Sequence, residues 1–338
     1  MQHSSVEMEV LINILKKWNK KKKVLVIVIT AVVVVILGIL SWIMYLNSYK
    51  PSQNIYFLEY ENEYEKNDTI IFKYDPTSNK VEEIGRVPGY LYKCVINNEE
   101  SRITGFLKEN RVKSKSDIIV YDIETGTAES KEIMDKIFEL TMDIPWYGVL
   151  YDGGDKIVVN YADDKENEWV LFYDFATGED ERVVADINEI YQFLAIDDHS
   201  LWYYKYFGAI YHYDWKTQTK TKILDSVNSA TMSPNNGIIA YTEGLSQDKI
   251  YLYDISQGKI KTIASGGWNI YYGDLSISGT NAWWSNDNRQ FCYISYFPGL
   301  FQEADTRLMV YDIESGRQRC IYKVNATLHE LRYILSSY

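Results

Sequence analysis

The sequence predicts an all-β domain, a six-bladed β-propeller of four-stranded blades, preceded by one transmembrane α-helix. Two observations predict this arrangement. A Tyr-Asp pair followed by a short polar turn occurs six times, and one long uncharged apolar run lies near the N-terminus. The 30 Tyr also favour strands, because flat amphipathic side chains suit a half-buried pleated surface. We expect a basic cytoplasmic segment over 1–23, the membrane helix over 24–46, a linker over 47–53 and the propeller over 54–338.

The apolar run extends from Val24 to Leu46 without a charged residue. As a helix it would be about 35 Å long, which is enough to cross a hydrocarbon core with some tilt. Six lysines precede it within 16–23, whereas only Lys50 follows closely. The positive-inside rule therefore predicts a single-pass protein of the cell membrane with a cytoplasmic N-terminus and an extracytoplasmic propeller. A cleaved signal peptide is the alternative, but the run is longer than such peptides need and no small-x-small site follows it.

The charge of the chain is unevenly distributed. The net charge is -12, yet the first 50 residues carry seven Lys against two Glu, so the remaining residues carry 28 basic and 45 acidic side chains. A domain this acidic repels phosphate backbones, which argues against nucleic acid as a partner.

Three cysteines, Cys94, Cys292 and Cys320, are widely spaced and none belongs to a CxxC pattern. This spacing argues against a zinc site or a disulfide framework. We predict three buried free thiols, because isolated cysteines pack as small apolar side chains. One disulfide with a third thiol left over is the alternative.

The six Tyr-Asp copies share one pattern: an alternating apolar strand, a turn, and a polar strand that ends in Ile or Val. Their aspartates are Asp75, Asp122, Asp174, Asp214, Asp254 and Asp312. The fourth residues after them are Asn79, Gly126, Gly178, Gln218, Gly258 and Gly316. That position suits a left-handed backbone, which Gly adopts freely and Asn tolerates. Each carboxylate can accept the turn's N–H groups, so we assign these aspartates a structural role in the turns rather than a catalytic one.

Successive copies are 47, 52, 40, 40 and 58 residues apart, close to the length of a four-stranded blade. A second polar turn and strand precede most copies, most clearly at Met232–Tyr241. The pattern Ser-Pro-x-x-Gly-x-x-Ala-Tyr, followed by a strand ending in Tyr-Asp-x-x-Ser/Thr-Gly, resembles the TolB-like (PD40-type) propeller repeat over about 54–338. The resemblance implies the architecture, whereas proteins with this repeat include scaffolds, peptidase gatekeepers, lyases and sensors.

The ends of the repeat region predict how the ring closes. One strand, about 54–60, precedes the first hairpin, and one, about 328–335, follows the last. We predict that both belong to the first blade, which leaves no open sheet edge. In each blade, one face of the ring carries the turn between the first and second strands and the turn between the third and fourth strands. We call it the bottom face. The other loops lie on the opposite face, the top face. The chain enters at the bottom, so we expect that face near the membrane and the top face outward.

Variable loops on a repetitive frame usually carry binding sites. The irregular top loops are 61–69, 108–116, 134–146, 162–168, 265–272 and 296–306. Aromatic residues in or beside them are candidate binding residues, because exposed rings stack on sugars and peptides. They are Trp146, Tyr147, Phe207, Trp268, Tyr271, Tyr272, Phe297 and Phe301. The alternative is that several of them pack between blades.

Signals for chemistry are weak. The sequence has no GxSxG, HExxH, phosphate-loop or dinucleotide motif. Its four histidines, His3, His199, His212 and His329, are scattered, and the acidic loop 163–168 lacks the spacing of a calcium loop. We expect no metal and no cofactor. The sequence thus favours a binding, scaffold or sensory module for a protein, peptide or cell-wall glycan, with a propeller lyase or hydrolase acting in the central funnel as the alternative.

Overall fold

The chain forms two compact units, Met1–Lys50 and Pro51–Tyr338, each described by itself. The structure, a computed structural model, describes residues 20–47, 49–61, 68–108, 117–131, 135–137, 148–162, 167–184, 190, 192–205, 208–243, 249–265, 271–272, 282–297, 305–325 and 329–335.

The first unit contains one apolar helix, α2 (Lys20–Asn47). Its segment Val24–Ser41 has a mean hydropathy of 3.3, and none of that segment is buried. By length and composition the helix could cross a membrane. It begins four residues earlier than the predicted span, so the run Lys20–Lys23 forms its first turn.

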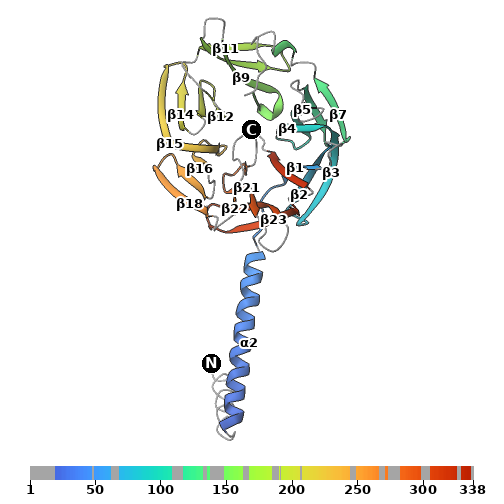
Figure 1. Ribbon diagram of the computed structural model, residues 1–338, viewed down its shortest axis with the longest axis vertical. Helices are drawn as coiled ribbons and strands as arrows, with labels where there is room; N and C mark the ends of the chain where they lie inside the picture. Colours follow the sequence, from blue (N-terminus) through green and yellow to red (C-terminus); the bar gives the residue numbers. More distant parts are fainter. Residues whose placement is uncertain are drawn as a thin grey trace, which may run out of the picture. The chain divides into compact units, whose positions relative to one another are not determined.

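The second unit is a ring of antiparallel sheets (Figure 1). We number the blades in the order of their Tyr-Asp hairpins. Blade 1 has β24 (His329–Leu335), β1 (Ile55–Glu61), β2 (Asp68–Asp75) and β3 (Lys80–Pro88); blade 2 has β4 (Tyr90–Ile96), β5 (Arg102–Lys108), β6 (Asp117–Asp122) and β7 (Thr127–Lys131). Blade 3 has β8 (Val149–Tyr151), β9 (Lys156–Ala162), β10 (Glu168–Asp174) and β11 (Asp180–Val184), with the short 3₁₀ turn η1 (Asp152–Gly154) between its first two strands.

Blades 4 and 5 share one long strand. Blade 4 has β12 (Gln192–Ile196), β13 (Ser200–Tyr204), β14 (Gly208–Asp214) and the first part of β15 (Thr219–Met232). Blade 5 has the second part of β15, then β16 (Ile238–Glu243), β17 (Lys249–Asp254) and β18 (Lys259–Ser265). The strand β15 pairs with β14 up to Val227 and with β16 from Val227 onward, and the left-handed Ser226 (φ 60°) marks the change.

Blade 6 has β19 (Tyr271–Tyr272) and β20 (Ala282–Trp284), which both pair with β21 (Gln290–Phe297), followed by β22 (Asp305–Asp312) and β23 (Gln318–Asn325). The described strands thus group into six blades of four, with β19 and β20 together in the first position of blade 6. This grouping agrees with the predicted all-β propeller.

The predicted closure of the ring is confirmed. The C-terminal strand β24 pairs with β1, from Tyr56 opposite Leu335 to Glu61 opposite His329. Blade 1 therefore combines a C-terminal first strand with three N-terminal strands. Because β1 is paired on both sides, no open edge remains at the point where the two ends of the propeller meet.

The six hairpin turns have the local geometry that their sequences suggest. The fourth residue after each aspartate is left-handed in every copy, including Gln218 (φ 53°). Each aspartate accepts a backbone N–H of its own turn; Asp122 Oδ1, for example, accepts from Thr125 at 2.7 Å. This N–H lowers the pKa of Asp122 below its ordinary value. The turn is therefore stabilised by the carboxylate above about pH 4, and that contribution is lost as pH falls through the lowered pKa.

Apolar side chains fill the spaces between neighbouring blades. Phe106 and Ile118 of blade 2 pack with Leu150 and Ile157 of blade 3, and all four are almost fully buried. Similar clusters join blades 1 and 2, blades 3 to 5, and blades 5 and 6. Burying one such side chain contributes roughly 1.5–3 kcal/mol, so stacking of the blades is a main source of stability.

One cysteine prediction is wrong. All three cysteines are free, and Cys94 and Cys292 are buried as expected. Cys320 is exposed, because it lies in β23, the outermost strand of blade 6, where one sheet edge meets solvent.

Candidate functional site

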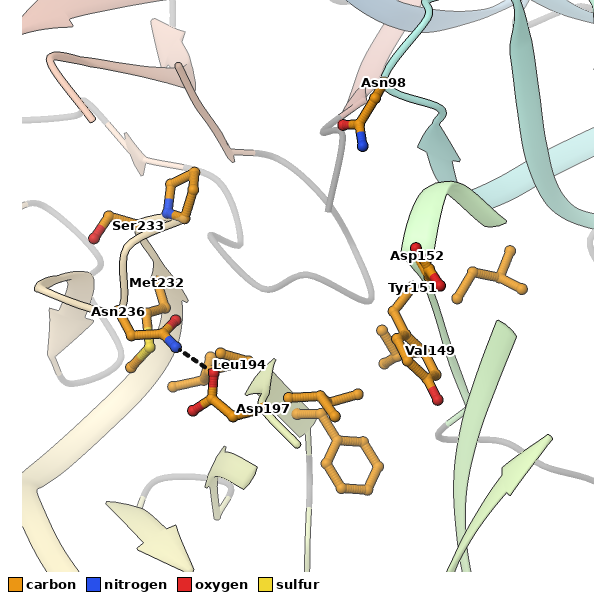
Figure 2. A pocket seen from close by; sticks show the side chains of 14 residues that line it. Asn98, Val149, Tyr151, Asp152, Leu194, Asp197, Met232, Ser233 and Asn236 are labelled. Atoms are coloured by element: carbon orange, nitrogen blue, oxygen red, sulfur yellow. Dashed lines mark hydrogen bonds between the residues drawn. The ribbon is translucent and has the colours of Figure 1, made fainter. Parts of the chain in front are cut away.

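A cavity of about 400 Å³ lies at the bottom face, near the centre of the ring, where the first strands of blades 2 to 5 end in turns (Figure 2). We call it the axial cavity. Its lining residues are Asn98, Val149, Leu150, Tyr151, Asp152, Phe193, Leu194, Ala195, Ile196, Asp197, Met232, Ser233, Pro234 and Asn236. Four consecutive blades contribute to it, so the cavity depends on contacts between blades.

The walls of the axial cavity are apolar and its rim is polar. Leu150, Phe193, Leu194 and Met232, which are at most 2% exposed, belong to the first strands. Polar side chains belong to the turns that follow those strands. A cavity of this size with apolar walls and a few polar groups is typical of ligand sites, because the walls bury ligand surface while the polar groups orient it.

Asp197 is one of two carboxylates on the rim, and its position is fixed. Its Oδ1 accepts a hydrogen bond from Nδ2 of Asn236 at 2.8 Å, drawn as a dashed line in Figure 2. Its Oδ2 accepts from Oγ of Ser200 at 3.0 Å. The first of these bonds joins the turn of blade 4 to the turn of blade 5, so the rim is held together across the blade boundary.

Asp152 is the second carboxylate on the rim. It begins a run of three left-handed residues, Asp152 (φ 53°), Gly153 (φ 64°) and Gly154 (φ 88°). Its Oδ2 lies 2.9 Å from Nζ of Lys156. Gly153 and Gly154 are buried, and a Cβ on either would meet Asn97 or Thr104 of blade 2. This close approach of the backbone to blade 2 places Asp152 at the cavity.

The charge of the rim favours one class of ligand. The described residues that line the axial cavity include two carboxylates and no Lys, Arg or His; Asp152 is paired with Lys156, which lies outside this lining, so Asp197 is the carboxylate without a basic partner there. A ligand that presents N–H donors or a positive charge would be attracted, whereas a phosphate or carboxylate would be repelled.

Hydrogen bonds between turns continue around the bottom face. Nδ2 of Asn54 donates to Oε2 of Glu100 at 2.6 Å, which joins the start of blade 1 to blade 2. The backbone N–H of Asn235 donates to Oδ1 of Asn288 at 3.1 Å, which joins blade 5 to blade 6. The N–H of Ser52 donates to Oε1 of Gln290 at 2.8 Å. The segment 51–54 that leads into the propeller therefore lies on the same face as the axial cavity.

The aromatic residues predicted to bind ligand are not brought together by the described part of the chain. Trp146, Tyr147, Phe207, Trp268 and Phe301 lie outside the described residues. Tyr271 and Tyr272 form β19 and Phe297 ends β21, but only their backbone is described. Top-face binding by these residues therefore stays a prediction.

The histidines do not form a described metal or catalytic cluster. The ring of His212 stacks on Trp202, with ring centroids 4.4 Å apart. Nε2 of His199 lies 3.6 Å from Oδ2 of Asp214. Among the described residues no three His, Cys, Asp or Glu side chains gather as metal ligands. His3 and residues 163–166 of the acidic loop lie outside the described residues, as does the side chain of His329.

Sequence reasoning missed the axial cavity because each contributing turn resembles an ordinary polar turn. The position of these turns within the repeat could have indicated the cavity. Three successive repeats have, at the same place, Asp152-Gly153-Gly154, Asp197 and Ser233-Pro234-Asn235-Asn236. Equivalent turns of a propeller meet around its axis, so side chains in these turns converge.

Comparisons with known proteins identify the fold. No protein-family model matches the chain, and no curated protein matches it in sequence. Among solved structures, TolB from Acinetobacter baumannii is similar with a TM-score of 0.54 at 12% identity, over 84% of this chain and 65% of that one. A putative TolB from Agrobacterium tumefaciens is similar with a TM-score of 0.51 at 10% identity, over 84% of this chain and 99% of that one.

These likenesses concern the fold alone, because the identities are low. The chain spans less than two thirds of the length of the Acinetobacter protein. Since 902 chains of solved structures match, the likeness does not single out one activity. Together with the ring of sheets and the strand pairing that closes it, the comparisons show that this chain has a TolB-like β-propeller fold preceded by an apolar N-terminal helix.

Proposed function

We propose that this protein is a membrane-anchored extracytoplasmic module that binds a protein or peptide in the axial cavity. The observation that carries the proposal is the combination of deeply buried apolar walls with a rim whose described residues include the carboxylates of Asp152 and Asp197 but no basic side chain, Lys156 lying beside Asp152 outside the lining. An extended peptide segment fits this combination, because it offers apolar side chains for the walls and N–H donors for the rim.

Membrane anchoring is the second part of the proposal. The helix α2 has the length and apolar character of a membrane span, and its first turn consists of four lysines. Lysines on this side favour a cytoplasmic N-terminus. The segment 51–54 that follows is bound to the bottom face, so the chain enters the propeller on the face that carries the axial cavity.

Labelling of Cys320 tests the topology. Its thiol is exposed, whereas Cys94 and Cys292 are buried. We expect a membrane-impermeant maleimide to label Cys320 on intact cells, because the propeller lies outside. A Cys320→Ser variant should lose this label. In the Cys320→Ser background, a cysteine introduced at Ser4, Ser4→Cys, should react only after the cells are permeabilised. Labelling of Cys320 only after permeabilisation would contradict the proposed topology.

Site-directed photo-cross-linking tests the binding site. A photoreactive amino acid at the exposed rim residue Asn98 should give a discrete cross-linked protein in intact cells, because Asn98 borders the axial cavity. Filling the cavity with Ala195→Phe should remove that product, with an unchanged melting temperature as the check that the variant folds. The control position is Gln257, an exposed hairpin residue on the bottom face that does not line the cavity. The same products from both positions, or a product that survives Ala195→Phe, would count against the axial site.

A further inference from the structure

A second cavity, of about 520 Å³, lies between blades 3 and 4 and adjoins the axial cavity. We call it the interblade cavity. The two cavities share Tyr151, Ile196 and Asp197 in their linings. The remaining lining residues are Lys156, Phe172, Glu181, Asp198, His199 and Trp215. Aromatic rings and carboxylates are thus the two main components of this lining.

Three aromatic rings in contact form one side of the interblade cavity. The rings of Tyr151 and Phe172 meet edge to face, with centroids 6.5 Å apart and an interplanar angle of 83°. Phe172 in turn packs on Trp215 of blade 4, with centroids 5.4 Å apart and an angle of 40°. All three residues are only partly buried, so ring surface is available to a ligand.

The residues of this aromatic wall are specific to one blade junction. Phe172 lies two residues before the hairpin aspartate of blade 3, and Trp215 directly follows that of blade 4. Residues equivalent to Phe172 in the other hairpins are Lys73, Val120, His212, Leu252 and Val310. Residues equivalent to Trp215 are Pro76, Ile123, Phe175, Ile255 and Ile313. Phe175 and His212 are the aromatic residues among these equivalents, and they lie at different junctions, so no other junction has an aromatic residue at both positions.

The charges around the interblade cavity favour a cation. Its two basic groups lie near carboxylates: Nζ of Lys156 is 2.9 Å from Oδ2 of Asp152, and Nε2 of His199 is 3.6 Å from Oδ2 of Asp214. The exposed carboxylates of Glu181 and Asp198 have no ion-pair partner among the described residues.

The pKa of Tyr151 is consistent with a negative local field. Burial raises this pKa above its ordinary value, and the charges of Asp152, Asp174 and Glu181 raise it further.

The propeller already places lysines over aromatic rings elsewhere. Nζ of Lys220 lies 4.9 Å from the ring centroid of Tyr211, and Nζ of Lys131 lies 5.4 Å from that of Phe175. Such cation–π contacts contribute about 0.5–2 kcal/mol, depending on desolvation. In the described part of the chain no Lys or Arg covers the rings of the interblade cavity in this way.

We propose that the interblade cavity binds the side chain of a lysine or arginine from a peptide or partner protein. The alkyl stem packs on Phe172 and Trp215, and the cationic end group lies beside the carboxylates of Glu181 and Asp198. This site goes beyond the proposed function, because it is separate from the axial cavity and can be tested without knowledge of what the axial cavity binds.

The test uses the full chain in a neutral detergent, labelled with 5-fluorotryptophan, and follows the ¹⁹F resonance of Trp215. Trp215→Phe assigns that resonance. The probes are the N-acetyl methylamides of lysine and arginine, with the norleucine derivative as the uncharged control. We expect saturable shifts with the two cations and a much smaller shift with norleucine. The double variant Glu181→Gln and Asp198→Asn should weaken binding of the cations about fivefold or more, the size expected for loss of roughly 1 kcal/mol of attraction.

The matched control variant is Glu129→Gln. Glu129 lies opposite Val120 in blade 2, as Glu181 lies opposite Phe172 in blade 3, and both glutamates are exposed. The Glu129→Gln variant should leave binding of the two cations to the interblade cavity unchanged. Ala195→Phe should also leave this binding unchanged, and that result would distinguish the interblade cavity from the axial cavity. The proposal is overturned if the norleucine derivative shifts Trp215 equally, if no cation shifts it, or if Glu129→Gln weakens binding as much. Tighter binding of tetramethylammonium than of the lysine derivative would overturn the assignment to a peptide side chain.

Discussion

A chain that ends at Asn325 is expected to lose the cooperative thermal unfolding transition of the propeller. This truncation removes β24, the first strand of blade 1, and leaves one edge of β1 unpaired. Phe57 and Leu58 in β1 and Leu335 in β24 are fully buried, so the loss of pairing also exposes apolar core. At roughly 1.5–3 kcal/mol for each apolar side chain that loses its burial, three such residues amount to a large share of the 5–15 kcal/mol that typically stabilises a folded domain. Circular dichroism of the detergent-solubilised chain during heating measures the transition.

The matched control is a chain that ends at Leu335, which retains all of β24. Its transition should equal that of the full chain, because every pair between β1 and β24 is kept. Equal melting temperatures for the chains ending at Asn325 and Leu335 would contradict the role assigned to the closing strand.

Gly154→Ala is expected to cost about 2–4 kcal/mol in unfolding free energy, through two separable effects. The residue is left-handed, with φ 88°, where a side chain costs roughly 1–2 kcal/mol. Its added Cβ would also overlap Cβ and Oγ1 of Thr104 in blade 2, and overpacking of a core typically costs about 1–3 kcal/mol. Chemical denaturation followed by circular dichroism measures the change.

Gly258→Ala separates the two effects. Gly258 is also left-handed, with φ 61°, but no heavy atom lies within 4 Å of its added Cβ. This variant should therefore show only the backbone cost, about 1–2 kcal/mol. In a Thr104→Gly background, Gly154→Ala should cost less than in the wild type and approach the cost of Gly258→Ala, because the overlap is removed. If Gly154→Ala and Gly258→Ala cost the same, the contact between blades 2 and 3 is looser than described.

Much of the propeller could be predicted from the sequence because its repeat is local. A Tyr-Asp strand, a turn with a left-handed fourth residue and a polar strand form one hairpin, and six hairpins of this kind define the ring. Even Gln218, the weakest match to the pattern, has φ 53°. The closing strand could be predicted as well, since one unmatched strand at each end of the repeat region leaves a single way to complete blade 1.

The cavities could not be predicted in this way, because they depend on which residues meet across blades. Asp152, Asp197 and Asn236 are separated in sequence and meet only when the turns of blades 3, 4 and 5 gather at the axis. The pairing of Phe172 with Trp215 likewise crosses a blade boundary. The exposure of Cys320 depends on its place in an outermost strand, which composition alone does not give. Local patterns specify a hairpin, whereas contacts between hairpins specify a site.

The pairing of β24 with β1 has a consequence for biosynthesis. Ribosomes make β1 among the first strands of the propeller and β24 last, so a nascent chain cannot close the ring while it is being made. A chain that stops before residue 329 leaves β1 with an open edge that other extended chains can join. We therefore expect the stable ring only from polypeptides that include β24, whereas chains without it are expected to be more prone to proteolysis and aggregation.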